Sequence, residues 1–285
     1  NITITGGIRT TPAAKGYFDT GSEYTFTLND VTIDGEGNEY SGPIIDNGNP
    51  KTIINLNRCT IKDYKIKKNN GNGIIELYGS ALNITNSTIT GCMGGVGMIT
   101  TDAGADSVNK IKITSSNITD NKSRVFSGIS MDITIDGGTF ENNDGGLIAV
   151  RKSYSTGSMV TINGGTFKNN SAKNGGVISS GGSTVTINGG NFTNNSATDK
   201  GGVIYNSTAE SRVYLYGGYF ADNTANGSPN DIYNGENATI DLNIGSANVP
   251  VRTGYTYGGW KDNNGNIYNK ANRLYSVSGA NNGLT

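Results

Sequence analysis

The chain has 285 residues, with 43 Gly and only 5 Pro, and 34% of its residues are hydrophobic while 16% are charged. Neither a collagen-like repeat nor a charged disordered segment has this composition, so the sequence predicts an ordered protein rich in turns. The absence of His excludes Ser-His-Asp catalysis, Cys-His catalysis and His-ligated zinc. A net charge of −1 argues against binding to nucleic acid.

The chain opens within a run that resembles a strand, where Ile2 and Ile4 alternate with threonines. We therefore expect it to be a mature fragment of a longer polypeptide. No apolar run reaches the roughly 18 residues that span a bilayer, so direct membrane insertion is not expected. Cys59 and Cys92 cannot form a disulfide framework, which leaves a single bridge or, as we favour, two free structural thiols.

A repeat of 22 to 29 residues then runs along the chain. Each copy contains an apolar anchor residue in a short stretch where apolar and polar side chains alternate. These anchors are Leu28, Leu56, Ile84, Ile113, Ile135, Ile162, Ile187, Leu215 and Ile240, and Ile4 is the candidate for a tenth. Alternation with a period of two is typical of a half-buried strand, and a fixed repeat of this length is typical of stacked architectures.

Copies this short cannot bury their apolar face alone, so successive copies must stack and share one core. The sequence therefore predicts an all-β fold, a parallel β-helix of about nine or ten turns. Right-handed coiling is expected from the chirality of crossover connections between parallel strands.

The four clearest copies, residues 133–140, 160–167, 185–192 and 213–220, predict the role of individual positions. One apolar position in each should point inward: Ile135, Ile162, Ile187 and Leu215. One aromatic position should form a stacked interior column: Phe140, Phe167, Phe192 and Phe220. Gly-Gly pairs before each Phe permit a bend with positive φ. An Asn three residues after each Phe should tolerate the left-handed region and form a hydrogen-bonded ladder: Asn143, Asn170, Asn195 and Asn223.

These motifs resemble those of a known repeat class. Phe140 to Asn143 and its three equivalents match the F-x-x-N motif of the chlamydial polymorphic membrane proteins. The segments Gly145–Ile148, Gly175–Ile178 and Gly201–Ile204 are similar to their G-G-A-I motif, with Leu or Val in place of Ala. The resemblance covers residues 133 to 223 and implies an adhesin-like protein that is displayed at a cell surface.

The C-terminal part resembles a different module. Residues 250–260 and 262–268 are similar to the Listeria–Bacteroides repeat, a small β-rich module of bacterial surface proteins. We therefore divide the chain into a β-helix at residues 1–237 and a truncated module at residues 238–285. This resemblance implies a bacterial, extracellular, cell-surface location.

A local change in side-chain chemistry marks a candidate binding site. Positions held by Thr or Asn in other copies become aromatic near residue 215, which predicts an outward-facing platform for sugar rings or a protein partner. The platform residues are Tyr205, Tyr214, Tyr216, Tyr219 and Tyr233. The alternatives are that Tyr simply suits strands, or that these rings pack beneath the C-terminal module.

Charge is also uneven along the repeat. Basic residues concentrate between positions 51 and 124, where they form either an ordinary solvated face or a stripe suited to acidic glycans. The stripe would contain Lys62, Lys65, Lys67, Lys68, Lys110, Lys112, Lys122 and Arg124. An acidic cluster at Asp34, Glu36 and Glu39 fits a solvated loop better than a cation site.

These observations predict a secreted or surface-displayed segment that binds a host or environmental glycan or surface protein. It would act as a monomeric segment of a larger surface protein, without catalytic residues, metal or cofactor. The alternative is a polysaccharide lyase or glycoside hydrolase, because pectin-lyase-like enzymes use the same fold.

Overall fold

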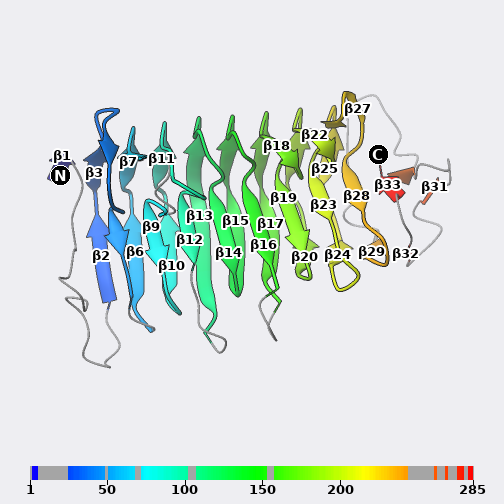
Figure 1. The fold of residues 1–285 in the computed structure, drawn as a ribbon, viewed down its shortest axis with the longest axis horizontal. Coiled ribbons are helices and arrows are strands. Elements are labelled where there is room, and N and C mark those ends of the chain that lie inside the picture. Colours follow the sequence, from blue (N-terminus) through cyan, green and yellow to red (C-terminus); the bar gives the residue numbers. More distant parts are fainter. Residues whose placement is uncertain are drawn as a thin grey trace.

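The computed structural model describes residues 2–5, 25–48, 51–67, 72–101, 107–152, 157–242, 260–261, 267–268, 275–278 and 282–284. Every element assigned in these residues is a β-strand, and the strands stack along one long axis (Figure 1). This part of the chain therefore contains no helix that could cross a membrane.

The largest sheet has 16 strands and forms two faces of the coil. Its first face contains nine strands, the longest of which continue round the bend into the second face. These strands are β2 (Thr25–Asn29), β6 (Ile53–Asn57), β10 (Ala81–Thr85), β13 (Asn109–Thr119), β15 (Met131–Glu141), β17 (Met159–Lys168), β20 (Thr184–Ile187), β24 (Arg212–Leu215) and β29 (Thr239–Leu242). Its second face is completed by β1 (Ile2–Thr5), β3 (Val31–Asp34), β7 (Thr60–Lys62), β11 (Thr88–Thr90), β21 (Asn191–Thr193) and β25 (Tyr219–Ala221).

A second sheet of nine strands forms the opposite face. It contains β5 (Ile45–Asp46), β9 (Ile75–Leu77), β12 (Ile99–Thr101), β14 (Phe126–Ile129), β16 (Ile148–Arg151), β19 (Ile178–Gly181), β23 (Ile204–Asn206), β28 (Ile232–Asn234) and β33 (Asn282–Leu284). The eight strands from β5 to β28 run parallel, and only β33 is antiparallel. Eight parallel strands enclose seven complete turns, so the expected parallel β-helix is confirmed with fewer turns than predicted. The sequence-based prediction counted one turn for each anchor residue, whereas a stack of strands encloses one turn fewer than the number of its strands.

Smaller sheets lie at the corners and the C-terminal end. One corner sheet contains β18 (Ser171–Asn174), β22 (Ser196–Lys200), β26 (Thr224–Ala225) and β27 (Ser228–Pro229). Two-stranded pairs join β4 (Glu39–Tyr40) to β8 (Lys65–Ile66) and β30 (Trp260–Lys261) to β31 (Ile267–Tyr268). At the C-terminal end, β32 (Tyr275–Ser278) pairs antiparallel with β29.

The core follows the predicted alternation. Ile135, Ile162 and Ile187 have no solvent exposure, and Leu215 has 2%. The four phenylalanines stack in one column, with ring centroids 4.9 Å apart for Phe140 and Phe167, 4.7 Å for Phe167 and Phe192, and 4.6 Å for Phe192 and Phe220. The first three rings are fully buried, whereas Phe220, at the end of the column, is half-buried.

The corner backbone explains the Gly-Gly and Asn-Asn pairs. The second glycine of each pair has positive φ, for example 111° at Gly138 and 118° at Gly165. At the next corner the left-handed residue is the first of the two asparagines, Asn142, Asn169 or Asn194, with Asp222 in the last copy. The predicted left-handed conformation therefore lies one residue before the ladder asparagines. The exposed first residue makes the bend, which turns the second side chain inward.

The second asparagines form a continuous hydrogen-bonded ladder inside the coil. The amide of Asn143 donates to Oδ1 of Asn170 over 2.9 Å, and the amide of Asn170 donates to Oδ1 of Asn195 over 3.0 Å. The amide of Asn195 donates to Asn223 over 3.0 Å, and Asn121 donates to Asn143 over 2.8 Å at the other end. These side chains are at most 2% exposed, so the ladder satisfies polar groups in the core.

The last copy departs from the predicted alignment. Leu215 pairs with Leu242, and Ile240 pairs instead with Val213. Ile240 is fully buried as expected, but the register partner of Leu215 is Leu242, two residues later than the alignment predicted. Since β29 pairs in parallel with β24, the main sheet continues past residue 237. Residues 250–259 and 262–266 of the C-terminal motif lie outside the described residues, and the separate module stays a prediction.

Candidate functional site

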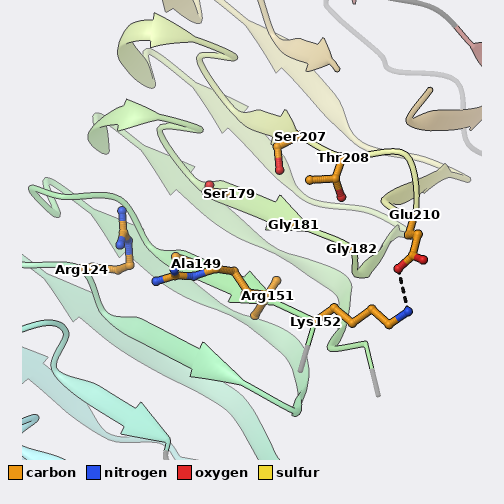
Figure 2. A pocket seen from close by; sticks show the side chains of 11 residues that line it. Arg124, Ala149, Arg151, Lys152, Ser179, Gly181, Gly182, Ser207, Thr208 and Glu210 are labelled. Atoms are coloured by element: carbon orange, nitrogen blue, oxygen red, sulfur yellow. Dashed lines mark hydrogen bonds and ion pairs between the residues drawn. The ribbon is translucent and has the colours of Figure 1, made fainter. Parts of the chain in front are cut away.

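A shallow hollow of about 450 Å³ lies on the outer face of the nine-stranded sheet (Figure 2). It extends over four consecutive turns, from just before β14, across β16 and β19, to just after β23. The residues that shape it are Arg124, Ala149, Arg151, Ser179, Gly181 and Ser207. At about 4.8 Å per rung, the three intervals give it a length of about 14 Å along the helix axis.

The floor of the hollow is low because small residues occupy the outward positions of neighbouring strands. Ser127, Ala149 and Ser179 are direct register partners on β14, β16 and β19. Gly181 continues the floor beside them, and a Cβ there would lie 3.5 Å from Cγ of Arg151 and 3.4 Å from Oγ of Ser207. The intervening side chains point into the core, so only the outward row is free to shape the surface.

Two arginines border the floor. Arg124 is half-buried just before β14, and the exposed Arg151 ends β16. Figure 2 shows the Arg151 side chain extending over Ala149 toward Arg124. Burial, together with the positive charge of Arg151, lowers the pKa of Arg124. The two like charges therefore face a common space.

The third cation of the hollow is neutralised. Lys152 Nζ lies 2.6 Å from Oε2 of Glu210, the one carboxylate in the lining. Within the described part of the chain, neither Arg124 nor Arg151 has an ion pair with an acidic side chain. The hollow is therefore positively charged at its arginine side.

Aromatic side chains continue the same outward row. Tyr205 pairs in register with Ser179, and Tyr233 pairs with Tyr205 on the next rung. The two rings stack with centroids 5.6 Å apart, and Lys200 Nζ lies 4.6 Å from the centroid of the Tyr233 ring. Lys200 also donates to the Tyr233 hydroxyl over 3.3 Å, which raises the lysine pKa. A small-residue floor thus leads directly onto an aromatic platform.

The other three predicted platform residues lie on a different sheet. Tyr214 and Tyr219 belong to β24 and β25 of the 16-stranded sheet, and Tyr216 directly follows β24. The rings of Tyr214 and Tyr216 are parallel within 4°, with centroids 6.2 Å apart. The five tyrosines therefore form two separate groups, because consecutive strands of one turn face different directions.

Part of the charge noted in the sequence is paired. Asp34 lies 2.7 Å from Lys62 and accepts a hydrogen bond from the Glu36 amide, and Lys112 pairs with Asp136 over 3.2 Å. Lys110 and Lys112 lie on β13 of the main sheet, whereas Arg124 borders the opposite sheet, so these three side chains do not form one stripe. Lys68 lies outside the described residues. In the part of the chain that the structure describes, no three His, Cys, Asp or Glu side chains are grouped as a metal site.

The profile of a family described as the right handed beta helix region matches residues 52–220 of this chain. The chain belongs to this family. The match includes all the residues that shape the hollow, and it agrees with the right-handed coiling expected from the sequence. No curated protein and no solved structure matches the chain.

In this right-handed β-helix, sequence reasoning identified Tyr205, Tyr233 and Arg124 but missed the rest of the hollow. The Gly-Gly-x-Ile motif could have indicated the outward positions of this sheet. The residue after its Ile is Ala149, Ser179 or Tyr205 in successive copies, and each points outward in one register row. The motif does not predict the position of Arg151, because the proximity of Arg151 to Arg124 depends on how the turns stack.

Proposed function

We propose that this right-handed β-helix is a non-catalytic binding segment of an adhesin-like bacterial surface protein. It would attach to or display a glycan of a host or of the environment, held on the outer face of the nine-stranded sheet. The observation that carries the proposal is the alignment of the hollow with the stacked Tyr205 and Tyr233. A polar cleft beside half-buried aromatic rings suits a sugar chain, which presents hydroxyl groups at its edges and C–H groups on its ring faces.

The charged groups of the hollow favour binding over hydrolysis. Glycoside hydrolysis uses a pair of carboxyl groups on either side of the scissile bond. Among the described residues, the lining of the hollow has one carboxylate, Glu210, and it is paired with Lys152.

A glycan array probed with the whole 285-residue chain tests the proposal. We expect retention of a subset of glycans, and about tenfold weaker binding when Tyr205 or Tyr233 is replaced by Ser. Tyr214→Ser, on the other sheet, is the matched control and should bind like the unchanged protein. If Tyr214→Ser alone weakens retention, the binding face is the 16-stranded sheet.

A cleavage assay on the retained polysaccharides distinguishes a binding segment from the alternative, a polysaccharide lyase or glycoside hydrolase. Release of new reducing ends or of unsaturated products, lost in Glu210→Gln, would replace the binding proposal with a lyase or hydrolase. Absence of any retained glycan, together with retention on arrayed surface proteins, would replace the glycan with a protein partner. The cell-surface location is tested separately, by antibody labelling of intact cells that produce the protein.

A further inference from the structure

We infer that the hollow recognises the acid group of an anionic saccharide, a carboxylate or a sulfate ester, placed between Arg124 and Arg151. This inference rests on the proposed function, because it assigns the ligand class of the same site. It goes beyond a general glycan-binding role, since it requires charge on the ligand.

Among the described residues, neither Arg124 nor Arg151 has an acidic partner. Arg124 is half-buried and Arg151 projects toward it, while the nearby carboxylate of Glu210 is occupied by Lys152 at 2.6 Å. Two like charges that share a partly desolvated space repel each other, and a bound anion removes this cost. The lowered pKa of Arg124 has the same origin, burial followed by the charge of Arg151.

The shape of the hollow fits the same ligand. Guanidinium groups present planar, forked donors that match the oxygens of carboxylates and sulfates. The floor between them has no large side chain, because Ala149, Ser179 and Gly181 occupy the outward positions. An acid group can therefore approach both arginines from the solvent side.

The aromatic platform identifies a saccharide as the carrier of the acid group. Tyr205 follows Ser179 in the same outward row, so a ligand that lies along the helix axis places one unit at the arginines and a later unit over a ring. With about 14 Å between the first and the fourth rung, the site accommodates an extended chain of several sugar units.

The test is isothermal titration of the whole chain with three probes. These are a short oligogalacturonate, which carries a carboxylate on each sugar, its carboxyl-reduced neutral counterpart, and a sulfated dextran oligosaccharide. We expect the unchanged protein to bind at least one anionic probe about tenfold more tightly than the neutral one, with affinity that falls as salt rises. The two anionic probes distinguish carboxylate from sulfate recognition.

Variants then locate the acid site. Arg151→Gln and Arg124→Gln should each weaken anionic binding by about tenfold and leave binding of the neutral probe unchanged. Lys110→Gln removes one charge from the opposite sheet and should have no effect. Gly181→Val keeps every charge but fills the floor, and it should weaken binding of all probes. Since Arg151 is exposed, its variant keeps the test valid if Arg124→Gln fails to fold.

Three results would overturn the inference. One is equal binding of the neutral and anionic probes, and another is anionic binding that survives both arginine substitutions. In either case the proposed function stands without recognition of an acid group. The third is retention of none of the probes, and the proposed function falls with it only if the glycan array is also negative.

Discussion

The side-chain amide of Asn223 donates a hydrogen bond to Oδ1 of Asp231 over 2.7 Å, and both side chains are buried. Asn223 is the last asparagine of the interior ladder, and each amide in the ladder donates toward the C-terminal end. A carboxyl group thus terminates a chain of amide groups that all point the same way. Asp231 accepts the final hydrogen bond in a site from which water is excluded.

The stability of the protein should fall as the pH rises from about 4 to about 7, because of Asp231. Burial raises the pKa of this carboxyl group from 3.8 to about 7, with a smaller contribution from the nearby charge of Asp222. The folded protein therefore binds this proton more tightly than the unfolded chain does. The associated stabilisation is complete below pH 4 and is lost as the pH rises through about 7.

Asp231→Asn isolates this contribution, since Asn keeps an oxygen acceptor for Asn223 and cannot ionise. Denaturant unfolding at pH 5 and pH 8 should show the variant gaining free energy of unfolding relative to the unchanged protein, by up to ~3 kcal/mol. Parallel pH profiles for the two proteins would show that Asp231 does not titrate in this range.

Substitution of one ladder residue should destabilise the coil severely. In Asn170→Ala, the backbone and side-chain amides of Asn143 lose the acceptor Oδ1 of Asn170, and Oδ1 of Asn195 loses the donor Nδ2 of Asn170. Phe140 O loses its side-chain donor, so several buried groups are left unsatisfied and the free energy of unfolding should fall by about 3 kcal/mol. Chemical denaturation measures this loss.

Asn188→Ala is the matched control for Asn170→Ala. Asn188 also donates to an asparagine of the neighbouring turn, Asn163, over 2.7 Å, but it is exposed on the outer face. Water replaces the lost hydrogen bond there, so the cost should be below about 0.5 kcal/mol. Equal losses in the two variants would mean that burial of the ladder does not contribute.

The adjacent glycines Gly137 and Gly138 should differ in their tolerance of a side chain. Both have positive φ, 88° and 111°, but a Cβ at Gly137 meets no atom within 4 Å, whereas a Cβ at Gly138 would overlap Ser116 O. Gly137→Ala should cost about 1 kcal/mol from backbone conformation alone. Gly138→Ala should cost about 3 kcal/mol, because the carbonyl of the neighbouring turn must also move.

Thermal unfolding of both glycine variants compares these costs directly. If Gly137→Ala is the more damaging of the two, the close approach of successive turns at this corner is not what requires glycine.

Cys92 should resist thiol reagents in the folded protein. It is fully buried, and burial raises the pKa of its thiol to about 12, so the reactive thiolate is absent at pH 8. Mass spectrometry after iodoacetamide treatment should find Cys92 unmodified in the folded protein and alkylated after denaturation. Rapid alkylation under native conditions would show that this corner opens on the timescale of the reaction.

Cys92 also illustrates how closely the sequence repeat predicts the interior. Its backbone amide donates to Oδ1 of Asn121 over 3.0 Å, so this fully buried side chain lies at the end of the asparagine ladder. The free state of both Cys59 and Cys92 agrees with the favoured prediction. Interior positions repeat with every turn, so an alignment of the copies is sufficient to identify them.

The outer surface could be predicted only in part. The alternation within each strand indicated that Tyr205 and Tyr214 face outward, but not that they lie on different sheets. Each turn bends at corners whose loops vary in length, so positions that look equivalent in the sequence can belong to different faces.

The sequence by itself determined the stacked coil, the inward residues, the aromatic column and the asparagine ladder. It could do so because a shared core imposes the same burial requirement on each copy of the repeat. Only the tertiary structure decided that Arg124 and Arg151 border one hollow, and that Leu215 pairs in register with Leu242 in the last rung. Those relationships depend on the register between turns, which is fixed by pairing between strands that lie some 25 residues apart in the sequence.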